Sequence, residues 1–296
     1  MGYLFLSVAL ICGSVKGYCG KKTSGIINST KDAMTANLIR VVICAIIGFL
    51  MIAISNDLEF IIPSGEILLI SLLSGIATSV FIISWLISAK TGAYMMLDVF
   101  LMASVILPII LGIFLFDEKV DLTDWIGIII LLTATLIMCS YNNSIKGKMS
   151  AKAAVLLIIC SIACGICDFS QKLFVKNALG VPISVFNFYT YLFASITLIF
   201  ALAVMGRKKE RSFAKFELKS VFLYILIMAI CLFAHSFFKT LAAKYLPSVG
   251  LYPLSQGASL ILSSLMASIL FKEKITLKCT IGIVLAFLGL ILINVI

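Results

Sequence analysis

The sequence predicts an all-α integral membrane protein of ten transmembrane helices, arranged as two inverted five-helix repeats. Hydrophobic residues make up 62% of the 296-residue chain and charged residues only 12%, whereas a soluble domain is about half apolar and about a quarter charged. The apolar residues form continuous runs of roughly 17 to 25 residues, the length that crosses a bilayer core about 30 Å thick. In addition, one segment occurs twice, at residues 115–128 and 270–283.

The repeated segment is a charged turn between two apolar runs. Glu118-Lys119 in the first copy matches Glu273-Lys274 in the second, and both copies end on Ile-Gly-Ile. A fixed period of this kind indicates a duplicated structural unit. Each glutamate would lie just before the next helix, where the helix dipole favours negative charge. We therefore expect both glutamates to shape a turn.

The apolar runs give the expected elements in order. Polar residues that can cap a helix stand before two of them, Asp121 or Thr123 before the fifth and Thr276 before the tenth. The first run has no basic segment before it and no small-residue cleavage site, so we expect a span rather than a signal peptide. Strands are not expected, because the runs are continuous and too long. The expected helices are 3–20, 34–54, 67–89, 93–115, 123–141, 152–175, 183–205, 218–241, 247–271 and 276–295.

A polar, turn-rich link at residues 142–148 divides the chain into two halves. We expect a first five-helix repeat over residues 1–143 and a second over residues 150–296. Because five is an odd number, the second repeat enters the membrane from the opposite side. The two repeats would then be related by a pseudo-twofold axis in the membrane plane, an architecture typical of transporters with a site near the midplane.

Charge and cysteine content exclude several classes of function. The net charge is +10, but the basic residues lie between the apolar runs, as expected at an anionic membrane surface, so no nucleic-acid partner is expected. Most of the nine cysteines lie inside apolar runs. Cys164 and Cys167 form a C-x-x-C without a second pair, which favours packing over a metal or redox site. The sequence predicts no cofactor and no bound metal.

The chain resembles the drug/metabolite transporter superfamily, in particular its EamA-type ten-helix members. The resemblance rests on the two Glu-Lys turns, on the Ile126-Gly127 and Ile281-Gly282 pairs that follow them, and on Arg40 early in the second helix. It implies transport of a small organic solute, often export of an amino acid or related metabolite. It also implies a central cavity lined by the first, third, fourth, sixth, eighth and ninth helices. Lys16 in the first helix departs from the family pattern.

Charged residues inside apolar runs are the first candidates for a substrate site, because intramembrane charge costs a few kcal/mol. Lys16 and Asp168 occupy matching positions in the two repeats. Inversion would put them on opposite sides of the midplane, lining one cavity at different depths. A zwitterion could then place its carboxylate on Lys16 and its ammonium on Asp168. The alternatives are separate structural partners for each, or a Lys16 that extends to the membrane interface.

Other polar and aromatic residues add to the expected site. Asp98 in the fourth helix could bind a cation or carry a proton, or pair with a neighbour. His235, the only histidine, could relay protons, although a hydrogen-bonded helix contact is the commoner role. Lys239 is expected to extend to the interface. Trp85 and Tyr252 could present rings to a substrate or belong to the aromatic belt.

Pro253, with glycines nearby, is expected to interrupt the ninth helix beside the site.

These features predict a multi-pass protein of the cell membrane that carries a small-molecule substrate by alternating access, as a monomer or homodimer. A flippase for a lipid-linked group is the alternative, and it requires a side opening toward lipid. An enzyme is not expected, because the single histidine and few carboxylates provide no catalytic cluster. The basic loops favour termini outside the cell, whereas the family resemblance implies termini inside.

Overall fold

The computed structural model describes residues 1–24, 30–90, 100–140, 151–178, 180–206, 218–271 and 277–295. Within these residues the chain is α-helical apart from turns and one 3-10 helix, and no strand occurs. Only helices satisfy every backbone hydrogen bond within an apolar segment that has no access to water. The helices are α1 (Gly2–Ser24), α2 (Thr30–Ile54), η1 (Leu58–Ile61), α3 (Gly65–Lys90), α5 (Ile106–Phe116), α6 (Leu122–Ser140), α7 (Ala151–Asn177), α8 (Ile183–Gly206), α9 (Leu218–Ala242), α10 (Ser248–Phe271) and α11 (Leu277–Val295).

Six of the described helices are long and apolar enough to cross a membrane, and shorter apolar helices stand beside them. Large apolar side chains cover the outside of the bundle; Phe114, Phe200 and Ile269 are each more than 70% exposed. Such a surface would be unstable in water and is suited to lipid. The protein is therefore a multi-pass membrane protein, and the bounds of the helices agree closely with those expected from the apolar runs except in the fourth segment.

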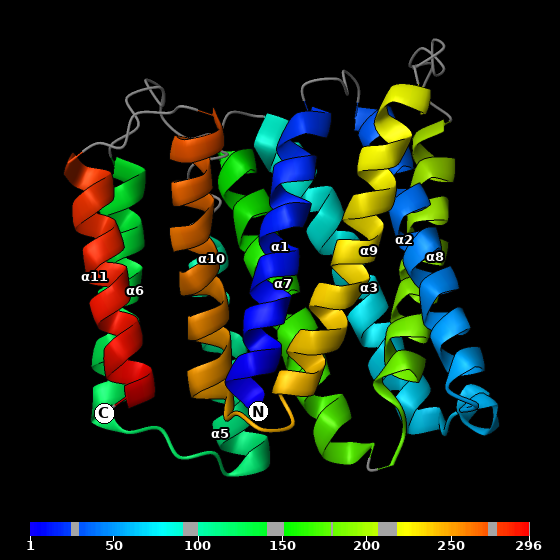
Figure 1. Ribbon diagram of the computed structural model, residues 1–296, viewed down its shortest axis with the longest axis horizontal. Coiled ribbons are helices and arrows are strands. Elements are labelled where there is room, and N and C mark those ends of the chain that lie inside the picture. The colour runs from blue at the N-terminus through cyan, green and yellow to red at the C-terminus, as the bar shows by residue number, and fades with distance from the viewer. Residues whose placement is uncertain are drawn as a thin grey trace.

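The helices stand side by side across the molecule, and both termini lie at its lower edge in Figure 1. The most extensive packing joins α1 to α9, α3 to α7, α2 to α8 and α6 to α11. At the α6–α11 contact the backbones approach closely: a Cβ built on Gly127 would lie 2.8 Å from the Gly289 carbonyl oxygen, and the reverse distance is the same. Small residues at such contacts let helices pack in lipid.

The fourth apolar segment differs from the single helix expected at 93–115, of which residues 93–99 lie outside the described residues. Its described part turns at Ser104 and Val105 before α5 begins. Pro108 explains this break, because it has no backbone N–H to donate to the carbonyl of Ser104. The break expected at Pro253 is absent, since α10 continues through that residue. Pro253 lies in only the second turn of α10, so its missing donor affects just the start of the helix.

Candidate functional site

A buried ion pair joins α7 and α9 inside the bundle. The ammonium of Lys239 lies 2.7 Å from Oδ1 of Asp168, and both side chains are 5% exposed. Tyr252 of α10 donates a 2.6 Å hydrogen bond to the backbone oxygen of Asp168, and its ring centroid is 5.4 Å from the Lys239 ammonium. The expectation that Lys239 extends to the interface is therefore wrong. The ammonium of Lys239 stays inside the bundle because it is paired with the Asp168 carboxylate on α7.

Lys16 of α1 and Arg40 of α2 are two further charged residues within apolar helices, and both are partly buried. None of the described residues forms a salt bridge or hydrogen bond with either side chain, and the buried Nε of Arg40 has no partner. The positive charges of Arg40 and Lys239 both act on Lys16. Of these three cations, only Lys239 is paired with a carboxylate in the described part of the chain. The carboxylate of Asp168 is already paired, although its buried Oδ2 accepts no hydrogen bond.

His235 connects α9 to α1 beside these charges. Its Nδ1 lies 2.8 Å from the carbonyl oxygen of Ala9. A carbonyl only accepts, so Nδ1 carries a proton, and in the neutral ring Nε2 then has a lone pair. The ring lies over Gly13, where a Cβ would be 3.2 Å from Nδ1. A hydrogen-bonded helix contact thus exists, as the commoner role of a membrane histidine suggests.

A second ion pair joins the segment that follows α5 to α7. Oε1 of Glu118 lies 2.9 Å from the ammonium of Lys172, and its Oε2 accepts the backbone N–H of Ser248 at 2.8 Å. Lys172 also donates to the carbonyl of Leu246 at 2.7 Å. Burial raises the pKa of Glu118, but the hydrogen bonds from Lys172 and Ser248 outweigh burial and hold it below its ordinary value.

The position of Glu118 also differs from expectation. Its carboxylate meets the positive end of the dipole of α10, not that of α6, the next helix along the chain. The left-handed backbone at Asp117, with φ of 51°, ends α5 and turns the following residue toward α10. The start of α6 has its own local bond, from the Asp121 N–H to the Asp124 carboxylate.

The remaining predicted site residues differ in their surroundings. Trp85 is partly buried and packs against a small cluster containing Leu157 and Cys160. Tyr252 is fully buried, so its ring contacts Lys239 rather than an open surface. Asp98 lies outside the described residues. No group of three or more metal-ligating side chains occurs among the described residues.

Sequence reasoning missed two members of this interior. Lys172 was not singled out, although it follows Asp168 by one helical turn within the same apolar run. Arg40 was noticed only for its family resemblance. In both cases the signal was available, because any charge inside a membrane span invites a partner or a function.

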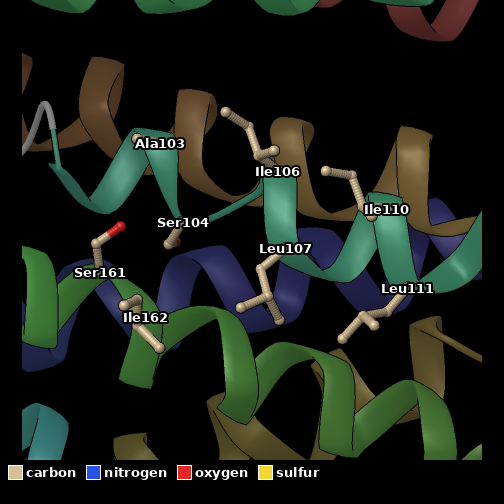
Figure 2. Close-up of a pocket in the computed structure, with 8 residues that line it drawn as sticks. All are labelled: Ala103, Ser104, Ile106, Leu107, Ile110, Leu111, Ser161 and Ile162. Carbon is tan, nitrogen blue, oxygen red and sulfur yellow. The ribbon is translucent and has the colours of Figure 1, made fainter.

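An apolar groove of about 440 Å³ lies between α5 and α7. Figure 2 shows Ile106, Leu107 and Ile110 along α5, with Ile162 on α7 across from them. Ile110 is 39% exposed and Ile162 is 47% exposed, so the groove opens toward the lipid side. Its lining contains no charged residue, so it is a different feature from the charged interior.

Comparison with known proteins identifies the second half of the chain. Residues 151–295 match the EamA-like transporter family. This half is an EamA domain. It places the protein in the drug/metabolite transporter superfamily, whose EamA members are transporters rather than enzymes.

The whole chain also resembles a solved protein. That crystal structure, titled only "Crystal structure of protein", aligns with a TM-score of 0.76 at 13% identity, over 98% of this chain and 95% of the other. At this identity the likeness supports the fold alone. No curated protein matches the chain in sequence.

Proposed function

We propose that the protein is a secondary carrier that exports a small organic metabolite, such as an amino acid, across the cell membrane by alternating access. The observation that carries this proposal is the charged interior. Lys16 and Arg40 come from the first half of the chain, whereas Asp168, His235 and Lys239 come from the second. Intramembrane charge is costly and marks substrate or ion pathways. Because residues from both halves form this cluster, movement of one half against the other would expose it first to one side of the membrane and then to the other.

The pattern of helix packing supports two inverted repeats, over residues 1–143 and 150–296. The helices of the two halves correspond in chain order: α1 to α7, α2 to α8, α3 to α9, α5 to α10 and α6 to α11. Under this exchange the contact of α1 with α9 becomes that of α7 with α3, and both contacts occur. The α2–α8 and α6–α11 contacts map onto themselves. In Figure 1, α1 begins at the lower edge and α7 at the upper edge. This is the relation that a twofold axis in the membrane plane would produce.

Counterflow in proteoliposomes tests the carrier. Vesicles loaded with unlabelled amino acids should accumulate the matching labelled compound, and the Asp168→Asn variant should lose this uptake. Glu59→Gln is the matched control, because Glu59 is exposed on η1, and it should transport normally. Uptake that is absent for every solute, or equal in Asp168→Asn, would contradict the proposal.

A flippase for a lipid-linked group is the second candidate, and the groove between α5 and α7 favours it. An acyl chain would fit its apolar lining while a polar headgroup crossed elsewhere. Vesicles containing fluorescent headgroup-labelled lipids separate the two functions. Protein-dependent exposure of the label to an external quencher, without counterflow of any soluble solute, would replace the carrier proposal with this one.

For orientation we adopt the family arrangement, with both termini in the cytoplasm. The structure supports a common side for the two termini (Figure 1). A reporter enzyme fused to the C-terminus, active only on one side of the membrane, tests which side it is. Periplasmic or extracellular activity would favour the orientation predicted by the basic loops.

A further inference from the structure

We infer that Lys16 and Arg40 form a binding site for the anionic group of the substrate, a carboxylate or a phosphate. The inference rests on the proposed function and narrows its substrate class. It also changes the zwitterion hypothesis, because Lys16 of α1 is assigned to the same anion as Arg40 of α2 and is no longer matched with Asp168.

Arg40 provides the first argument. Its Nε is buried and has no hydrogen-bond partner. The groups that act electrostatically on its guanidinium are Cys44 and Tyr191, which are neutral side chains at neutral pH. A guanidinium N–H that is cut off from water and has no acceptor is costly, because its lost hydration is not replaced. The structure therefore leaves Arg40 with a donor group that an anion from outside the protein would satisfy.

Lys16 provides the second argument. It belongs to a different helix, yet the charge of Arg40 acts on it more strongly than that of any other charged residue, and Lys239 adds to the repulsion. No salt bridge to Lys16 occurs among the described residues. Two like charges that repel each other inside an apolar bundle would both be stabilised by one anion between them.

The other ionisable groups of the interior leave its net charge positive. Lys239 is neutralised by Asp168 at 2.7 Å, so the ion pair contributes no net charge. His235 donates its Nδ1 proton to a carbonyl, for which the neutral ring is sufficient, and a protonated ring would only add positive charge. Of the interior groups described, Lys16 and Arg40 carry the net charge, and it is positive.

This arrangement suits a planar or tetrahedral oxyanion. A guanidinium can donate two parallel hydrogen bonds to a carboxylate or phosphate, and a lysine ammonium adds a mobile point charge. Asp168 is unsuited to be the first contact for a substrate ammonium, because that ammonium would have to displace Lys239. Organic anions should therefore bind better than their neutral or cationic analogues.

The test is ligand-dependent thermal stability of the purified full-length protein in detergent. A thiol-reactive dye can follow unfolding, because Cys44 and Cys160 are free and buried. The probes are matched pairs: leucine and leucinamide, succinate and succinamide, glycerol phosphate and glycerol. We expect at least one member with a carboxylate or phosphate to raise the melting temperature, and its partner without that group not to. A ligand that binds only the folded state stabilises it.

Two variants connect the effect to the site. Lys16→Met and Arg40→Gln should each weaken the apparent affinity for the stabilising anion about tenfold or more, the loss expected for one charge-assisted hydrogen bond. Lys119→Met is the control, because Lys119 is exposed in the loop after α5, and it should bind as the wild type does. Both site variants remove an unpaired charge, so we expect them to fold.

The outcomes separate this inference from the carrier proposal. Equal stabilisation by acid and amide, unchanged affinity in both variants, or no stabilisation by any anion would overturn the inference. If counterflow then occurs with neutral or cationic solutes, the carrier proposal stands without the anion site. If anions stabilise the protein through Lys16 and Arg40 but no solute is transported, the site stands and the carrier proposal fails.

Discussion

Lys239 and Asp168 form an ion pair across α7 and α9, with 2.7 Å between the ammonium and Oδ1. The backbone oxygen of Asp168 is held in turn by the hydroxyl of Tyr252. Three helices of the second half thus meet at Asp168. In an apolar interior such a pair is held together strongly, and loss of one partner leaves an uncompensated charge.

The single substitution Asp168→Asn should therefore destabilise the protein more than removal of both charges. We expect a loss of about 3–5 kcal/mol, the range for breaking a buried ion pair. The double variant Asp168→Asn with Lys239→Met should recover much of this loss. Denaturation of the purified protein in mixed micelles measures the difference. A double variant less stable than either single variant would show that the pair does not act as a unit.

The second ion pair gives a prediction about pH. The pKa of Glu118 is lowered in the folded protein, because hydrogen bonds from Lys172 and Ser248 outweigh the effect of burial. A carboxyl group with a depressed folded pKa stabilises the protein above its unfolded pKa and loses this effect as the pH falls through the folded value. The wild type should thus exceed Glu118→Gln in melting temperature at pH 7, and the two should converge below about pH 4.

Melting curves of both proteins between pH 3 and pH 8 check this prediction. Glu59→Gln, on the exposed η1, serves as the control and should follow the wild type throughout. A constant difference between wild type and Glu118→Gln across the whole range would mean that the ionised carboxylate is not the stabilising species.

The sequence predicted the helices well, because continuous apolar runs in lipid have one stable conformation. It was less informative about breaks. Pro108 and Pro253 both lie within apolar runs, but only Pro108 coincides with a turn, and α10 absorbs Pro253 without one. Which proline ends a helix depends on where it falls in the helix and on what its neighbours can accommodate, and spacing alone does not give that.

The charged residues were found by sequence, but their partners were not. Asp168 and Lys239 are 71 positions apart, and their pairing depends on how α7 and α9 are rotated against each other. The repeat matches Lys16 to Asp168 by their positions along two helices. These positions do not show how the helices are rotated about their axes. Lys172 lies in the same apolar run as Asp168 and Arg40 lies in the second run, but their positions along the chain do not show which groups they face.

The contact between α6 and α11 should be intolerant of any side chain at Gly127. A Cβ there would lie 2.6 Å from Cγ1 of Ile293 and 2.8 Å from the carbonyl oxygen of Gly289, and a backbone carbonyl cannot rotate away. We expect Gly127→Ala to destabilise the protein by about 1–3 kcal/mol, as overpacking does. Gly17→Ala is the control, since nothing lies within 4 Å of its added carbon. Equal unfolding curves for the two variants would show that the helices can separate without cost.

His235 allows a structural role to be distinguished from proton relay. Its Nδ1 proton bonds the Ala9 carbonyl, and the amide nitrogen of asparagine occupies nearly the same position as Nδ1. His235→Asn should therefore preserve the link between α1 and α9, whereas His235→Ala should lose it, along with about 1 kcal/mol of stability. We expect His235→Asn to keep most of the transport seen in counterflow. If both variants fold but neither transports, the titrating Nε2 is required, because asparagine provides the hydrogen bond without a group that exchanges protons near neutral pH.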